Sequence, residues 1–285
     1  MNKKLSRIYL LATFTVALFY NQSIVAQSLS FDGVDDYVSI GDNSNFDLQD
    51  AITVSVIVKP SSLQTTSIID RWAGNEVGYR LAFRGGDQDP SHPGAIWAQF
   101  GADDKVSSGN NIYSPNEWIE ITGVWKNNNY IKLYIDGLLI GETSTNESFE
   151  TDEPLEFARS FYGGVDTEYL SGLIDDIAIW NFELSESQIN SYVNSNIDIV
   201  EGLVGYWNFN ENSGSTLTDL SGNGNHGTIY GATWDTDSQD DDENDNDDGS
   251  IELLTNATEY GVGGSEMGYP INSWYHDVKH QSLYW

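Results

Sequence analysis

Apolar and polar positions alternate in short runs along most of the chain, and turn-forming residues separate the runs. The clearest run, 52–58, is rich in β-branched side chains and stops before Pro60, as a strand would. Asp136 and Gly137 stand between two apolar alternations, which is a strong hairpin signal. We expect strands over residues 28–31, 36–40, 52–58, 119–125, 130–135, 138–140, 155–158 and 173–180. Many short strands joined by turns predict an all-β sandwich or barrel.

One segment near the end of this region has a helical pattern instead. Ser185 and Gln188 have the spacing of a capping box, and Ile189, Tyr192 and Val193 then share one helical face. We expect a single short C-terminal helix directly after the last of these strands. Its position predicts that it plugs one end of the sandwich.

Residues 1–26 have the layout of a secretory signal peptide. Lys3, Lys4 and Arg7 precede the apolar run 8–19, and small or polar residues follow it. A membrane anchor is the alternative, but the run is shorter than the roughly 20 residues that cross a bilayer. No later apolar stretch is long enough either. We therefore expect a secreted protein, extracellular or at the cell surface, with no membrane insertion.

Charge and cysteine content limit which classes of partner the chain can bind and what can stabilise its fold. The chain has 44 acidic and 12 basic residues, a net charge of −32, and no cysteine. Such a charge repels phosphates, so nucleic acid is excluded as a partner. It favours divalent cations, which bind best to carboxylate oxygens. Without disulfides, the hydrophobic core and a metal ion are what remain to hold an exported domain together.

Composition also divides the chain into parts. Residues 27–234 carry the predicted strands and helix and form one domain. Residues 235–250 are dense in acidic residues and contain no apolar one, which predicts a disordered linker. An EF-hand loop aligned on Gly249 would need a glutamate where Thr255 stands. Residues 251–285 are again apolar and aromatic but too few for an independent domain, so we expect the truncated start of a further β-rich domain.

Three segments together resemble one known family. They are SLSFDGVDDYVSI, NEWIEITGVWKNNNYIKLYIDGLLIG and LSGLIDDIAIWNFELSESQI, in that order. They are similar to the laminin-G-like domains of the concanavalin-A-like jelly-roll family, and the resemblance covers residues 28–196. Residues 201–234 resemble the opening of the same domain, although they stand at its end here. They are either a shortened second copy or a segment that packs back onto the same sandwich, and we favour the second interpretation.

The resemblance implies a two-sheet antiparallel jelly-roll sandwich with a structural calcium ion near its edge. Transferred to this chain, it makes Asp32 and Asp176 the carboxylate ligands, with Gly33 lending a carbonyl oxygen. Asp175 and Asp176 are neighbours on a strand, so only one of them can face the core side. The alternative is that these acids are turn and edge residues without a metal.

The resemblance also requires a search for catalysis, because hydrolases of this fold carry closely spaced acids on one strand. The nearest match runs from Glu150 through Asp152 to Glu156. Its last acid is one residue too far, and Pro154 would interrupt a central strand. A zinc site at His276 and His280 lacks the glutamate of that motif. We therefore expect no catalytic residues and no enzyme activity.

Binding is the remaining function, and aromatic side chains are its expected instrument because sugar rings stack on them. Trp118 and Trp125 fall at family core positions. Trp72, Tyr79 and Trp97 lie in the variable middle among arginines, and we expect a ligand face there if they are not core residues. The predicted function is a non-catalytic module for carbohydrate or another extracellular matrix or cell-surface ligand. The alternatives are an accessory module of a secreted polysaccharide-degrading enzyme and a structural spacer in a surface adhesin.

Overall fold

The computed structural model describes residues 27–72, 77–149, 151–162, 165–195 and 199–236. The predicted leader 1–26, segment 251–285 and most of the predicted linker 235–250 lie outside the described residues. Asp235 and Thr236 are described and belong to a strand, so the sandwich extends two residues into the predicted linker. No helix among the described residues is long and apolar enough to cross a membrane.

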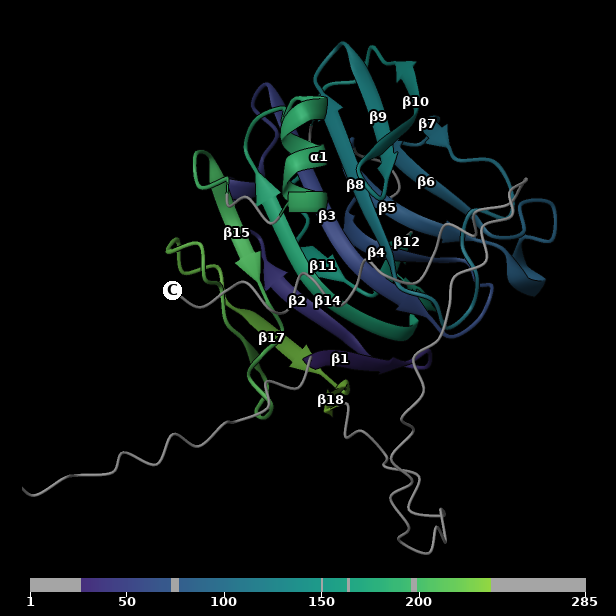
Figure 1. Cartoon of the computed structure of the whole chain (residues 1–285), viewed down its shortest axis with the longest axis vertical. Helices are drawn as coiled ribbons and strands as arrows, with labels where there is room; N and C mark the ends of the chain where they lie inside the picture. The colour runs from purple at the N-terminus through teal and green to yellow at the C-terminus, as the bar shows by residue number, and fades with distance from the viewer. Residues whose placement is uncertain (1–26, 73–76, 150, 163–164, 196–198, 237–285) are drawn as a thin grey trace, which may run out of the picture.

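The described strands form two antiparallel sheets packed face to face (Figure 1). Sheet A has the order β10-β9-β8-β3-β14-β1-β18, and β15 also pairs with β14. Its strands are β1 (Gln27–Asp32), β3 (Ala51–Pro60), β8 (Ile119–Lys126), β9 (Tyr130–Ile135), β10 (Leu138–Ser144), β14 (Ser171–Trp180), β15 (Leu203–Trp207) and β18 (Thr233–Thr236).

Sheet B has the order β16-β17-β2-β11-β4-β5-β6-β7. Its strands are β2 (Tyr37–Gly41), β4 (Thr66–Arg71), β5 (Tyr79–Arg84), β6 (Ala95–Phe100), β7 (Asp104–Ser107), β11 (Leu155–Phe157), β16 (Thr216–Leu217) and β17 (Gly227–Tyr230). A hairpin of β12 (Arg159–Tyr162) and β13 (Val165–Tyr169) contacts β4, and 3₁₀ turns span Ser44–Phe46 and Gly86–Gln88. These sheets confirm the predicted all-β sandwich.

The core lies between the sheets and follows from alternation. Val54, Val56 and Val58 on β3 point into it, and so do Leu81 and Phe83 on β5. The residues that alternate with them face outward, which decides what each outer face presents. The predicted hairpin is also confirmed, since residues 136 and 137 have φ of 49° and 77°, the positive values that a tight hairpin turn needs.

Residues 201–234 add strands to both sheets of the same sandwich. β15 pairs with β14, β17 pairs with β2, and β18 pairs with β1. The turn between β16 and β17 is held by Asp219, which accepts hydrogen bonds from the backbone N–H groups of Tyr206, Ser221 and Asn225. This segment therefore completes the domain, and its polar turn residues serve that packing.

Helix α1 (Glu186–Ser195) is the one α-helix in the described part of the chain, and its cap is as predicted. Ser185 N donates to Gln188 Oε1 at 2.9 Å, and Gln188 N donates to Ser185 Oγ at 3.3 Å. Its predicted place at one end of the sandwich is wrong. Ile189 packs against Val124 and Trp180, which point outward from sheet A, so α1 covers the outer face of that sheet (Figure 1). Those outward apolar residues require a cover.

Candidate functional site

The outer face of sheet B presents a continuous polar row. Leu81 and Phe83 point into the core from β5, so Arg80 and Arg84 point outward. The antiparallel register aligns Arg80 with outward side chains of the neighbouring strands. From β2 to β7 the row reads Ser39, Glu156, Asp70, Arg80, Gln99 and Lys105. Its acceptors, Glu156 and Asp70, are adjacent, and the donors Arg80 and Lys105 follow on either side of Gln99, so the row offers both kinds of group to a polar ligand.

A cavity of about 100 Å³ lies in this row beside Asp70. It is lined by Asp70, Trp72, Glu153, Pro154, Glu156 and Arg159. Asp70 Oδ2 accepts a hydrogen bond from Ser67 at 2.7 Å, but its buried Oδ1 accepts none from the described residues. Burial raises the pKa of Asp70 to about 7, although Arg80 and Ser67 act to lower it. Near neutral pH this carboxyl group can therefore accept or donate a hydrogen bond inside the cavity.

Glu156 lies directly opposite Asp70 in the register of β11 and β4, so two carboxyl groups are neighbours on this face. Glu156 is held by Arg159, whose Nε and Nη2 donate to it at 2.5 and 2.7 Å. Arg159 also lies 3.7 Å from the centroid of the Tyr37 ring. The cavity is well below the roughly 300 Å³ of ordinary ligand pockets. It therefore has room for a single small chemical group rather than for a whole ligand.

A second feature of the same face is Trp97 on β6, which is half-buried. The guanidinium carbon of Arg84 lies 4.2 Å and Lys105 Nζ 4.8 Å from its ring centroid. Asp89 anchors this arrangement, because it accepts hydrogen bonds from Arg84 Nε at 2.9 Å and from Ser91 Oγ at 2.7 Å. Burial raises the pKa of Asp89, but hydrogen bonds from the neighbouring side chains outweigh that effect and lower the pKa to about 2.

The three predicted aromatic ligand residues have different positions. Tyr79 is 0% exposed and packs in the core, where its hydroxyl donates to the carbonyl oxygen of Phe46, so its predicted role as a ligand residue is wrong. It alternates inward because it stands two residues before Leu81 on β5. Trp72 is 4% exposed, and Arg80 lies 4.4 Å from its ring centroid. It forms a wall of the cavity and cannot act as an open stacking platform.

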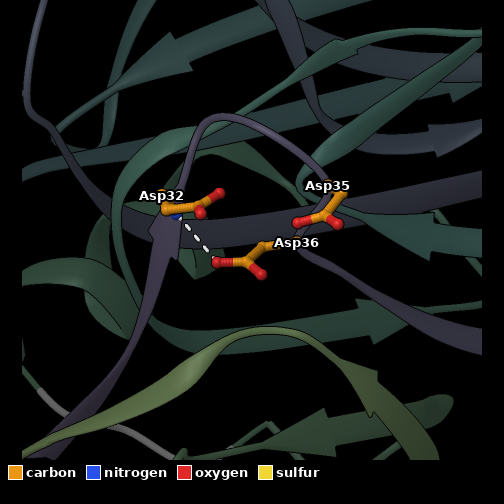
Figure 2. A group of neighbouring side chains, drawn as sticks. All are labelled: Asp32, Asp35 and Asp36. Carbon is orange, nitrogen blue, oxygen red and sulfur yellow. Dashed lines mark hydrogen bonds between the residues drawn. The ribbon is translucent and has the colours of Figure 1, made fainter.

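An acidic turn joins β1 of sheet A to β2 of sheet B. Asp32, Asp35 and Asp36 each place a carboxylate oxygen within 4.8 Å of the others (Figure 2). Asp36 Oδ2 accepts from Asp32 N at 2.9 Å, and Asp32 Oδ1 accepts from Val34 N at 2.8 Å. Burial and the neighbouring charges of Asp32 and Asp35 raise the pKa of Asp36. Gly33 has φ of +83°, and a Cβ there would lie 2.9 Å from Ser171 Cβ, so the turn needs glycine.

The predicted pairing of Asp32 with Asp176 is wrong. Asp32 pairs with Ser171 at the start of β14, whereas Asp176 stands five residues further along that strand, roughly 16 Å away. Asp176 Oδ1 instead accepts a hydrogen bond from the Tyr206 hydroxyl at 2.9 Å. The neighbours that the prediction missed, Asp35 and Asp36, stand within the same turn.

The acidic turn suits a calcium ion by its donor set. Calcium takes carboxylate oxygens at about 2.4 Å, so oxygens within 4.8 Å of one another can share one ion. Burial is the largest cause of the raised pKa of Asp36, and the charges of Asp32 and Asp35 add to it; the same closeness of acids favours a cation. Asp32, Asp35 and Asp36 are therefore the residues that would hold a calcium ion.

Comparison with known proteins identifies the fold. A solved structure of a provisionally assigned carbohydrate-binding protein from Bacteroides ovatus is similar, with a TM-score of 0.59 and 15% identity. The match covers 74% of this chain and 60% of that one, so this chain spans under two thirds of its length. No curated protein matches the chain.

Two further structures are more distant, and neither carries an argument. A heptameric SAP-like pentraxin from Limulus polyphemus has a TM-score of 0.47 and 17% identity, covering 61% of this chain and 84% of that one. The binding domain of botulinum neurotoxin DC, in complex with SialylT, has a TM-score of 0.43 and 16% identity, covering 59% and 42%.

The family itself is shown by sequence. A laminin-G family model, described as the concanavalin A-like lectin/glucanases superfamily, matches residues 32–190, which is more than half of the chain. The match agrees with the antiparallel sandwich described above. This chain therefore belongs to the concanavalin A-like lectin and glucanase superfamily.

Proposed function

We propose that this chain is a secreted, non-catalytic carbohydrate-binding module that holds its ligand on the outer face of sheet B. The observation that carries the proposal is Asp70, which lines a small cavity in a polar row and has one buried oxygen, Oδ1, without a hydrogen bond from the described residues. A buried acceptor left unpaired costs free energy, which a ligand hydroxyl would recover. The predicted signal peptide places the module where extracellular glycans are.

The chemistry of the face fits a saccharide. Sugar hydroxyls both donate and accept, and the row offers two carboxyl groups, a guanidinium group and an amide on neighbouring strands. The cavity, at about 100 Å³, receives one hydroxyl or hydroxymethyl group while the ring lies outside. Glu156 is held by two hydrogen bonds from Arg159, which favours a structural role for this carboxylate over a nucleophilic one.

The test is a glycan array probed with the purified full chain. We expect at least one glycan hit, and a loss of affinity of about tenfold or more in Asp70→Asn. Asp50→Asn is the matched control. It makes the same chemical change at a side chain that is 83% exposed and lies away from the row. An empty array, or equal binding by both variants, would refute the site.

The second part of the proposal is a structural calcium ion at Asp32, Asp35 and Asp36. Such an ion would tie β1 of one sheet to β2 of the other, because the acidic turn joins them. A ligand that binds only the folded state raises its stability, by about 2.7 kcal/mol at 100 times the dissociation constant. We expect calcium to raise the thermal midpoint by several degrees relative to chelator.

The control for calcium is built into the chain. Asp32→Asn and Asp36→Asn should abolish the calcium shift, whereas Asp176→Asn should keep it, because Asp176 is bound to Tyr206 elsewhere. A shift that survives in the first two variants, or is absent from the unmodified chain, would exclude this site.

A further inference from the structure

Three cationic side chains share one part of an otherwise acidic molecule. The net charge of the chain is −32, yet Arg80, Arg84 and Lys105 all point outward from β5 and β7 on the same face. Lys105 is exposed. The register Arg80–Gln99–Lys105 crosses β5, β6 and β7, so the outer two positions stand about 10 Å apart. We call Arg80, Arg84 and Lys105 the basic strip.

The strip is fixed in place by its neighbours. Arg80 donates from Nε and Nη2 to Gln99 Oε1 at 3.0 and 2.7 Å, and it lies against Trp72. Arg84 is held by Asp89, and both Arg84 and Lys105 lie over the ring of Trp97. Cations held against aromatic rings lose little further conformational freedom when an anion binds.

The same contacts change what Trp97 can do. Two cations already lie within 5 Å of its ring centroid, at 4.2 and 4.8 Å, so the indole is engaged by charge and is not a bare surface for stacking a neutral sugar. What this part of the face offers a ligand is therefore the charged groups. Guanidinium groups match carboxylates and sulfates geometrically, and an ammonium group pairs with either.

We propose that the glycan recognised by this module is an anionic polysaccharide, bearing carboxylate or sulfate groups that pair with the basic strip. The inference rests on the proposed function and names its ligand class. Charged groups on successive sugar residues would follow the 10 Å span, about that of a disaccharide, from Arg80 to Lys105. Negative charge farther away than about 8 Å is screened at physiological salt, so the carboxylates that compete with an anionic ligand are the near ones, Asp89 beside Arg84 and Asp70 opposite Arg80.

The experiment uses matched glycan pairs with the full chain. Alginate and polygalacturonate are compared with their methyl esters, and chondroitin sulfate with its desulfated, esterified form. We expect at least one anionic member to bind tenfold or more tightly than its neutral counterpart, with affinity falling as salt rises. A response of the uronate pairs indicates carboxylate recognition. A response of the chondroitin sulfate pair alone indicates sulfate recognition, because that pair changes both groups.

Variants locate the contact. The double variant Arg84→Gln, Lys105→Gln should reduce binding of the anionic glycan tenfold or more. Lys59 lies on β3 and is also a cation over an aromatic ring, that of Trp118, so Lys59→Gln is the control and should change binding less than twofold. Equal binding of a neutral counterpart, or no loss in the double variant, would overturn the anionic ligand and leave carbohydrate binding standing. If neither these pairs nor a panel of neutral glycans bind, carbohydrate binding itself fails.

Discussion

The two outer faces of the sandwich differ although the same alternation produces both. On sheet A the outward positions include Val124, Ala178 and Trp180, and helix α1 covers them with Ile189. On sheet B the outward positions of the central strands include Glu156, Asp70, Arg80 and Gln99. An apolar face must be removed from water, whereas polar side chains that pair with one another can line an outer face without a cover. A ligand can therefore contact the outer face of sheet B, which we call the open face.

The difference also separates stability from binding. The covered face contributes to the free energy of unfolding through apolar contacts, and the open face contributes mainly paired charges. Substitutions of similar size on the two faces should then have different consequences. The four predictions that follow test this difference in order of expected effect.

The largest effect is expected from Trp180→Ala on the covered face. Trp180 is 1% exposed, packs edge-on against Tyr192 and donates its Nε1 to the carbonyl oxygen of Ile199 at 2.7 Å. Truncation leaves a cavity and should lower the free energy of unfolding by about 3–5 kcal/mol. Urea unfolding measures this loss. A loss below about 1 kcal/mol would mean that α1 does not seal sheet A.

Glu156→Gln should show that the open face also contains buried charge. Arg159 and Glu156 have side chains that are 11% and 5% exposed, so the variant leaves a buried guanidinium without its counter-ion. We expect a loss of about 3 kcal/mol. Glu117→Gln, at an exposed position, is the control and should change stability by less than about 0.5 kcal/mol in the same assay.

Asp70→Asn should change how stability depends on pH. The pKa of Asp70 is raised to about 7 from 3.8, so the folded state binds more protons than the unfolded one between these values. The contribution of Asp70 to the free energy of unfolding is fully present below about pH 4 and is lost as pH rises through 7. Relative to Asp70→Asn, the unmodified chain should lose on the order of 2 kcal/mol between about pH 5 and pH 8. Parallel pH curves for the two proteins would contradict this.

The smallest effect on stability is expected from Trp97→Ala. Trp97 is half-buried on the open face, and its main contacts are with Arg84 and Lys105. Losing these should reduce the free energy of unfolding by about 1 kcal/mol. Urea titrations of Trp97→Ala and Trp180→Ala compare the open face and the covered face directly. A loss equal to that of Trp180→Ala would make Trp97 a core residue.

Most of sheet A could be predicted from the sequence, because its strands have clear turns around them and β-branched runs within them. Strands β4 to β7 of sheet B were not predicted. β4 has the sequence TSIIDR, in which the two apolar residues are adjacent and a register shift interrupts the pairing with β5, so it shows no alternation. β5 and β6 are interrupted by small and charged residues whose positions make sense only once the register is known.

The candidate site was missed for the same reason. Asp70 and Glu156 meet because β4 pairs with β11, and nothing local to either residue indicates the other. One weak signal existed: Glu156 stands between Leu155 and Phe157, which places it on the face opposite two core residues. That pattern identifies an outward acid, but its partner is set by strand order.

The sequence by itself determined the sandwich, the capped helix and the acidic turn, since each depends on residues a few positions apart. Asp32, Asp35 and Asp36 are near one another in any tight turn of that length. Only the tertiary structure decided that Asp176 lies elsewhere, that Tyr79 is core, and that the arginines of β5 share a face with Lys105. These depend on strand order and register, which are fixed by burying the whole core at once rather than by any local pattern.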